Sequence, residues 1–151
     1  MGAGDNMSKR SIIQVADLFC GAGGTSTGLL QAMDKLGVRV TLLAINHWKV
    51  AVETHSLNHS CVRHVCDALE NLDPRELVPS GKLRILVASP ECTHFSNARG
   101  GKPMSKQSRA TVKHVLRWVR NLDVQDVLIE NVREFQTWGP LHREGALGVD
   151  R

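Results

Sequence analysis

The sequence predicts an α/β fold, in which a mostly parallel β-sheet has helices on both of its faces. Short apolar runs of strand length alternate along the chain with segments whose apolar residues recur at helical spacing. The apolar runs are continuous, which is typical of parallel strands that are buried on both sides. At 151 residues the chain has the length of a single domain with a sizeable core.

Each predicted strand is followed by a helix or by a turn-rich segment before the next strand begins. We expect strands over residues 12–19, 40–45, 61–66, 83–88 and 124–129. We expect helices over about 26–36, 49–58 and 106–121, and the connection over 71–79 allows a further short helix. In the first helix Thr25 or Ser26 is the expected cap and Gly37 the expected stop.

The first and last helices each have one predicted buried side. Its apolar residues are Leu29, Leu30, Met33 and Leu36 in the first helix, and Val112, Val115, Leu116 and Val119 in the last. The opposite side of the last helix is basic, and we expect it to face solvent. Its members are Arg109, Lys113, Arg117 and Arg120.

The chain divides into three predicted parts: a flexible lead-in over 1–11, an α/β domain over 12–136 and a tail over 137–151. The net charge of +4 permits an acidic partner such as nucleic acid but does not require one. No apolar run is long enough for a membrane span, and no secretory signal is apparent, so we expect a soluble cytoplasmic protein with no membrane partner. The four cysteines are then expected to be free thiols.

A glycine-rich turn follows the first predicted strand. Residues 20–24 read Cys-Gly-Ala-Gly-Gly and lead into a helix, which is the start of a Rossmann-like unit that can hold an anionic ligand at the helix N-terminus. The spacing alone is a weak signal, because a simple tight turn would look the same. Later strands end at Asp67, at Ser89-Pro90 just before Cys92, and at Glu130. Since parallel strands end at one edge of a sheet, we expect these groups to gather there, with Cys92 as a candidate nucleophile.

Three motifs in the same order resemble those of the C5-cytosine DNA methyltransferase family. They are the glycine motif from Asp17 to Gly24 with Gly28-Leu29, the Pro90-Glu91-Cys92-Thr93-His94-Phe95-Ser96 segment, and Glu130-Asn131-Val132. The match extends from Ile13 to Phe135. It implies a Rossmann-like, S-adenosylmethionine-dependent methyltransferase fold and DNA as the substrate, with a bacterial or phage restriction-modification setting.

The resemblance assigns catalytic roles to four residues. Cys92 would attack C6 of a flipped-out cytosine, so that C5 becomes able to accept a methyl group. Glu130 would bind the N3 side of that base, and Asn131 would brace the catalytic loop. Arg109 would help to hold the flipped base or its backbone.

The resemblance also assigns a cofactor site for S-adenosylmethionine. Phe19 would pack on the adenine, Asp67 would accept a hydrogen bond from its amine, and Asn46 would face the ribose. We expect no metal in the site. The full expected set is Asp17, Phe19, Gly21, Ala22, Gly23, Gly24, Asn46, His47, Asp67, Ala68 and Pro90.

The sequence departs from the family pattern at three places. Glu91 stands where the family has proline, and a carboxylate beside Cys92 should raise the pKa of the thiol. Asn46 stands where the family has an acid that binds the ribose. After Phe135 there is no target-recognition region and the sheet is apparently truncated after its fifth strand, so the chain resembles a catalytic fragment or one half of a split enzyme with a complementing chain.

Other interpretations stay open. A histidine and cysteine cluster could form a zinc site, although the absence of a Cys-x-x-Cys pair favours a cluster that holds no metal. Its members are His55, His59, Cys61, His64 and Cys66. The chain could also be a non-catalytic fragment that only binds cofactor, or a methyltransferase of RNA cytosine.

Overall fold

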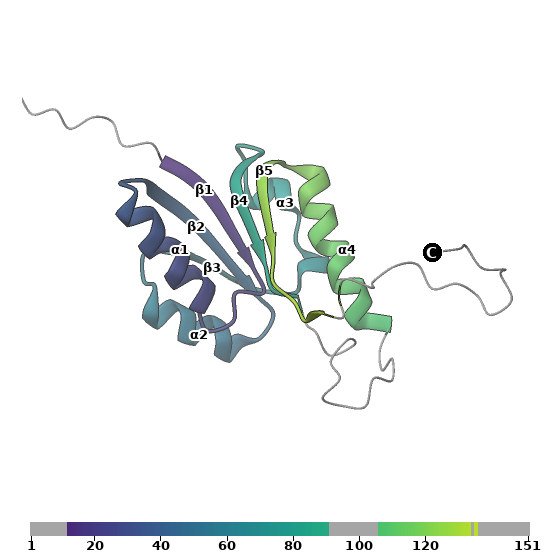
Figure 1. Cartoon of the computed structure of the whole chain (residues 1–151). Coiled ribbons are helices and arrows are strands. Elements are labelled where there is room, and N and C mark those ends of the chain that lie inside the picture. Colours follow the sequence, from purple (N-terminus) through teal and green to yellow (C-terminus); the bar gives the residue numbers. More distant parts are fainter. Residues whose placement is uncertain (1–11, 91–105, 134, 136–151) are drawn as a thin grey trace, which may run out of the picture.

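The computed structural model describes residues 12–90, 106–133 and 135, with backbone only for 106–110. Five strands form one parallel sheet in the order β3-β2-β1-β4-β5, as Figure 1 shows. This confirms the predicted fold class. The strands are β1 (Ile12–Leu18), β2 (Arg39–Asn46), β3 (Arg63–Cys66), β4 (Lys82–Ala88) and β5 (Asp123–Ile129).

The helices cover the two faces of the sheet. Helices α1 (Gly24–Lys35) and α2 (Lys49–Asn58) contact β2 and lie on one side in Figure 1. Helices α3 (Pro74–Leu77) and α4 (Lys106–Asn121) pack against each other on the opposite side, next to the 3-10 turn η1 (Leu69–Asn71). This arrangement follows from the parallel connections, because each crossover must return over one face of the sheet.

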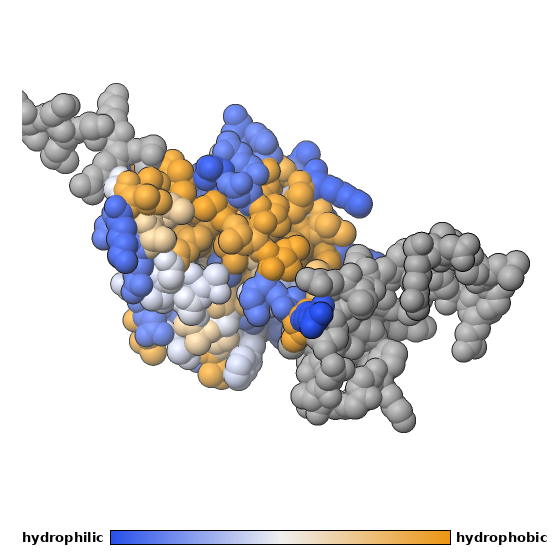
Figure 2. Space-filling model, in the orientation of Figure 1, coloured by the Kyte–Doolittle hydropathy of each residue, from blue (hydrophilic) through white to orange (hydrophobic). Residues whose placement is uncertain are grey.

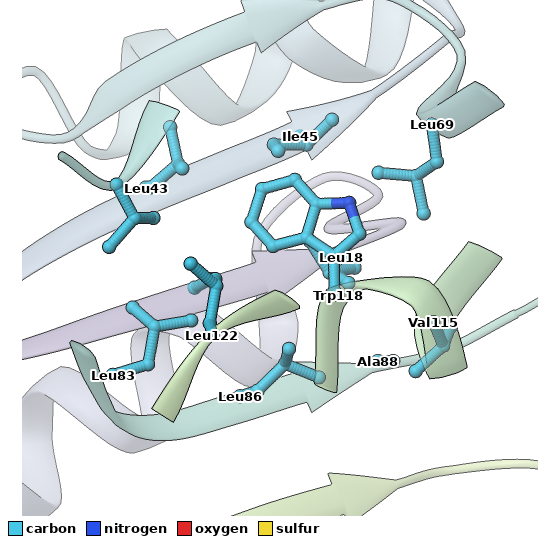
Figure 3. Packing of buried hydrophobic residues seen from close by; sticks show 12 residues of the cluster. Leu18, Leu43, Ile45, Leu69, Leu83, Leu86, Ala88, Val115, Trp118 and Leu122 are labelled. Atoms are coloured by element: carbon cyan, nitrogen blue, oxygen red, sulfur yellow. The ribbon is translucent and has the colours of Figure 1, made fainter. Parts of the chain in front are cut away.

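The core lies between the sheet and α4. Residues of β1, β2 and β4 that point to this face alternate with those that point toward α2, as the pleat of a strand requires. The indole of Trp118 is completely buried, and Figure 3 shows it among side chains from the strands and from η1. Leu18, Ile45 and Leu69 are members of the same cluster.

Two details of α4 differ from the sequence prediction. Leu116 is exposed, and the buried side of the helix is completed by Trp118. Arg117, which we predicted to face solvent, turns its guanidinium onto the η1 turn and the residue after it, where it donates to the carbonyl oxygens of Leu69, Glu70 and Leu72. The five donors of arginine suit this role, because each carbonyl at the end of a short helical turn needs a partner.

The start of α1 also differs from the prediction. Gly23 is the N-cap, with φ of 102°, and no side chain caps the helix. Ser26 is buried inside the helix instead of capping it, and Leu36, predicted to be on the buried side, is exposed. The helix ends at Lys35 and Gly37 follows with φ of 68°, in agreement with the predicted stop.

Strand β5 is exposed, although its continuous apolar run is typical of a strand that is covered on both faces. Val127, Leu128 and Ile129 are 41%, 54% and 42% exposed. These consecutive residues point to alternate faces of the sheet, so both faces are open at β5. Figure 2 shows a continuous apolar area where β1, β4 and β5 face the viewer in Figure 1. No helix in the described part of the chain has the length and apolar character needed to cross a membrane.

Candidate functional site

Backbone hydrogen bonds bring the carboxyl ends of four strands together. The amide of Cys20 donates to Ile45 O at 3.1 Å, which joins the end of β1 to that of β2. The amide of Ser89 donates to Leu18 O at 3.2 Å. Glu130 N donates to Ala88 O at 3.0 Å and so places the end of β5 beside that of β4. In a parallel α/β sheet this is the edge at which ligands bind.

The glycine-rich turn lies at the centre of this edge. Phe19, Gly21 and Gly23 have positive φ values of 63°, 53° and 102°, which reverse the chain between β1 and α1. The amide of Gly23 closes the turn on Cys20 O at 3.1 Å. A Cβ added at Gly21 or Gly24 would meet no atom within 4 Å, so the outer side of the turn is open. Open backbone at a helix N-terminus fits the binding of a carboxylate or other anionic group.

A chain of buried polar side chains lies beneath the turn. Asp17 Oδ2 accepts a hydrogen bond of 2.6 Å from Ser26 Oγ, which in turn lies 3.0 Å from His55 Nε2. His55 Nδ1 lies 2.8 Å from His64 Nε2. Because the hydroxyl hydrogen of Ser26 is given to Asp17, His55 must donate through Nε2 and accept through Nδ1 from His64. Each hydrogen bond in this series of side chains is therefore donated in the direction of the Asp17 carboxylate.

Burial shifts the pKa values of Asp17 and His55 in this buried series of side chains. It raises the pKa of Asp17 to about 6, an effect that the hydrogen bond from Ser26 and the electrostatic interaction with His59 only partly oppose. Burial lowers the pKa of His55 to about 4, with His64 and His59 acting in the same direction. The pKa of His64 is also lowered by burial. At neutral pH the site therefore holds a buried carboxylate and a neutral His55.

These two shifts predict opposite pH dependences in two variants. Between pH 4 and 6 native Asp17 binds a proton that the unfolded chain does not, so its contribution to stability is present at low pH and is lost as the pH rises through about 6. As the pH falls from 7 to 4, the parent chain should gain unfolding free energy from Asp17, and Asp17→Asn should not. The unfolding free energy of Asp17→Asn relative to the parent chain should therefore fall by about 3 kcal/mol over this range. Chemical denaturation at each pH measures this difference.

The contribution of His55 to stability changes with pH in the opposite direction. Its depressed pKa gives stability that is present above the ordinary histidine pKa and is lost as the pH falls through about 4. His55→Gln should therefore gain about 3 kcal/mol relative to the parent chain as the pH falls from 7 to 4. Gln31→Ala, which removes an exposed side chain without a titratable group on α1, is the matched control and should leave the pH dependence of stability unchanged. If the unfolding free energies of Asp17→Asn and His55→Gln, each relative to the parent chain, changed with pH in the same direction, the opposite pKa shifts of Asp17 and His55 would be contradicted.

The residues predicted to hold the cofactor lie along the same edge. Phe19 is half-buried and packs on the core through part of its ring. Asn46 Oδ1 accepts from Trp48 N at 2.9 Å, which leaves its amide hydrogens as donors. Asp67 Oδ1 accepts at 2.7 Å from both Ala68 N and Asn71 Nδ2, so its second carboxylate oxygen is the one that can meet a ligand.

Asp17, Gly23 and Pro90 differ from the others in the predicted cofactor set because they are buried. The carboxylate of Asp17 is directed into the polar chain beneath the turn, with Oδ1 unpartnered among the described residues. Pro90 receives a hydrogen bond of 3.0 Å on its carbonyl oxygen from Asn131 Nδ2. His47 is exposed after β2, and Ala22 is exposed in the glycine-rich turn.

The predicted catalytic residues are described only in part. Cys92 and Glu91 lie outside the described residues, as does the side chain of Arg109, whose backbone belongs to α4. Glu130 is exposed immediately after β5. The bond from Asn131 to Pro90 O ties the end of β5 to the segment that leads to Cys92. The bracing role that the resemblance assigns to Asn131 stays a prediction.

The histidine and cysteine cluster forms hydrogen bonds in place of a metal-ligand set. No group of three His, Cys, Asp or Glu side chains in the described ranges is arranged to hold a metal ion. His55 bonds to Ser26 and His64, and His59 Nε2 lies 2.9 Å from Thr27 Oγ1. Cys61 and Cys66 are exposed. Sequence reasoning noted these histidines but missed their partners, because Ser26 looks like a capping residue when read alone.

Cys20 is buried in the turn. Burial, followed by the neighbouring charge of Asp17, raises the pKa of its thiol to about 12. The thiolate is the reactive form of cysteine, so Cys20 is inert at neutral pH.

Comparison with known proteins identifies the family. The family described as C-5 cytosine-specific DNA methylase matches residues 13–139. The chain belongs to this family. Its methyltransferase fold and the order of its motifs thus confirm the resemblance found in the sequence.

Two curated relatives match most of the chain. The type II methyltransferase M.AgeI of Thalassovita gelatinovora is 28% identical over 125 residues, which are 80% of this chain and 28% of the relative. The type II methylase M.HgiDII of Herpetosiphon aurantiacus is 30% identical over 132 residues, which are 82% of this chain and 34% of the relative. The chain thus spans about a third of the length of these two enzymes.

Solved structures agree with the methylase fold. A prophage-encoded protein of E. coli described as a DNA modification methyltransferase superposes with a TM-score of 0.63 at 26% identity, over 82% of this chain and 33% of that one. The methyltransferase EhMeth of Entamoeba histolytica has a TM-score of 0.59 at 20% identity, over 83% of this chain and 39% of that one. The second likeness supports the fold alone.

Proposed function

We propose that this chain is the cofactor-binding and catalytic portion of a DNA cytosine-C5 methyltransferase that works in the bacterial or phage-infected cytoplasm. The observation that carries the proposal is the meeting of three strand ends at one edge. The glycine-rich turn follows β1, Ser89 and Pro90 follow β4, and Glu130 and Asn131 follow β5. In a member of this family, that arrangement supplies a cofactor cradle beside the segment that bears Cys92.

The described residues fit S-adenosylmethionine, which supplies an activated methyl group when bound. The open backbone of Gly21 and Gly24 at the start of α1 offers amide donors to a carboxylate. The amide of Asn46, whose oxygen is taken by Trp48 N, would donate to a ribose hydroxyl, where a carboxylate would have accepted. The second oxygen of Asp67 would accept from the adenine amine, since the first is taken by Ala68 and Asn71.

The catalytic step uses residues at the ends of β4 and β5. The Cys92 thiolate bonds to C6 of a flipped-out cytosine, and the electron pair released from the ring makes C5 nucleophilic. Glu130 hydrogen-bonds the N3 side and stabilises the ring while the adduct exists. After C5 has taken the methyl group, the C5 proton passes to water, its bonding pair re-forms the C5–C6 double bond, and Cys92 leaves C6 as the thiolate. Arg109 holds the flipped nucleotide.

Trapping of the covalent adduct tests this function. Fluorine at C5 blocks the final proton loss, so duplex DNA that carries 5-fluorocytosine should form a stable protein–DNA adduct in the presence of S-adenosylmethionine. We expect the adduct with the parent chain and none with Cys92→Ser, measured on a denaturing gel. Cys61→Ser, which changes an exposed thiol, is the matched control and should react like the parent chain.

Two further arms separate the alternatives. Adduct formed preferentially on 5-fluorocytosine RNA would replace DNA by RNA as the substrate. Calorimetry could show cofactor binding while no adduct forms, either with the chain alone or with the polypeptide encoded downstream added. The chain would then be a cofactor-binding fragment without catalytic activity.

The exposure of β5 supports the proposal that a complementing chain is required. Val127 and Ile129 point to one face of the sheet and Leu128 to the other, and all three are substantially exposed. A strand in a parallel sheet is ordinarily covered on both faces. We therefore expect the adduct yield to rise when the downstream polypeptide is supplied, because it would cover this strand.

A further inference from the structure

The last turn of α2 contacts the glycine-rich turn directly. His59 Nε2 lies 2.9 Å from Thr27 Oγ1, in the first turn of α1. Asn58 Nδ2 donates to Ala22 O at 3.5 Å. A Cβ added at Gly23 would come within 2.9 Å of both His59 Cδ2 and His59 Nε2, so the imidazole lies against the backbone of the turn. These contacts join residues that are far apart in the sequence.

The bond between His59 and Thr27 has a defined direction. The Thr27 hydroxyl donates to Gly23 O at 2.8 Å, and the Thr27 amide donates to the same oxygen at 2.8 Å. A hydroxyl has one hydrogen to give, so Thr27 Oγ1 accepts from His59 Nε2–H. His59 is thereby linked through Thr27 to the carbonyl of Gly23.

Within the turn, one backbone hydrogen bond restrains the shape, from Gly23 N to Cys20 O. Gly21 and Gly23 have positive φ values, and glycine moves more freely among backbone conformations than any other residue. Helix α1 has no side-chain cap, which in other helices sets the geometry of the first turn. The contacts from Asn58 and His59 therefore add restraint to the turn at Ala22 and Gly23, on its inner side.

We propose that His59, supported by Asn58, is a positioning residue that holds the glycine-rich turn in the shape that receives the cofactor. This rests on the proposed function, because the turn is the cradle for S-adenosylmethionine only if the chain is the catalytic portion described above. His59 acts through Thr27 and the backbone of Gly23, on the inner side of the turn. Its role is to reduce the number of shapes from which the cofactor must select.

The test compares three histidine variants of the full chain. His59→Ala removes the ring and its hydrogen bond, whereas His59→Gln keeps a side-chain N–H near the position of Nε2. His114→Ala is the matched control, since His114 lies on α4 and its ring faces Glu70 at 3.7 Å. Calorimetry with S-adenosylhomocysteine should show a Kd about three- to tenfold weaker for His59→Ala, near the parent value for His59→Gln, and unchanged for His114→Ala.

Hydrogen exchange at the turn provides a readout that needs no ligand. In the cofactor-free chain, the amides of Gly23 and Thr27 should exchange faster in His59→Ala and return toward the parent rate in His59→Gln. Asn58→Ala, which changes an exposed side chain, should give a smaller effect in the same direction and serves if His59→Ala does not fold.

The outcomes separate this proposal from the proposed function. A lower melting temperature in His59→Ala with unchanged Kd and unchanged exchange at Gly23 and Thr27 would overturn the positioning role. If the parent chain binds no S-adenosylhomocysteine while the exchange differences appear, His59 still holds the turn and the proposed function fails. If the parent chain binds the ligand and neither readout changes, the function stands and the positioning role fails.

Discussion

Replacement of Trp118 by alanine should lower the free energy of unfolding by about 3–5 kcal/mol, as expected for a large aromatic side chain lost from a core. Trp118 is 0% exposed and is the largest of the fully buried side chains in the described ranges. It lies among residues of β1, β2 and η1, so no single neighbour can move in to fill the space (Figure 3). Since domains are stable by only about 5–15 kcal/mol, the variant should be close to unfolded at room temperature. Urea denaturation followed by circular dichroism measures the loss.

Trp118→Phe is the matched comparison. The indole Nε1 is buried and has no hydrogen-bond partner among the described residues. Phenylalanine removes this unpaired donor, which offsets part of the lost packing, so the loss should be less than half of that in Trp118→Ala. Equal losses in the two variants would show that the indole N–H has a partner whose loss is costly.

Replacement of Gly23 by alanine should lower the free energy of unfolding by about 2–4 kcal/mol, because two penalties combine. Its φ of 102° is strained for a residue with a Cβ, and that Cβ would lie 2.9 Å from the His59 ring. The ring is held by Thr27 and cannot move away without losing its hydrogen bond. The same urea denaturation gives the value.

Two other glycines separate the penalties. Gly21 has φ of 53° but open space around its Cβ position, so Gly21→Ala should lose only about 1–2 kcal/mol. Gly28 is helical, exposed and free of neighbours within 4 Å, so Gly28→Ala should gain about 0.5–1 kcal/mol. A Gly23→Ala loss no larger than that of Gly21→Ala would mean that the contact with His59 contributes nothing.

The sequence was sufficient to predict those features that depend on local pattern. Continuous apolar runs located all five strands to within about two residues, since burial on both faces leaves few polar positions in a parallel strand. Helix α2 begins at Lys49 and ends at Asn58 as predicted, because its ends coincide with clear changes in polarity. Gly37 was read correctly as a stop, since its freedom at positive φ is a property of the residue itself.

Features that depend on tertiary contacts could not be read from the sequence. Arg117 looks like its basic neighbours on α4, and only the proximity of η1 gives its guanidinium three carbonyl partners. Ser26 follows a glycine loop as a capping residue would, but its hydroxyl is directed back to Asp17 on β1. Leu128 has the polarity of a core residue, and nothing local indicates that the part of the sheet around it is uncovered.

The strand order has a kinetic consequence. Neighbouring strands β1, β2 and β3 pair along the chain, as do β4 and β5, and each pair needs only one crossover. The ladder of β1 with β4, which pairs Val15 with Ile85, is the one that closes a long loop. The entropy of loop closure makes such a pairing slow relative to local ones. Assembly of the ligand-binding edge should therefore be a late event in folding, because the glycine-rich turn and the segment after β4 meet only when this ladder forms.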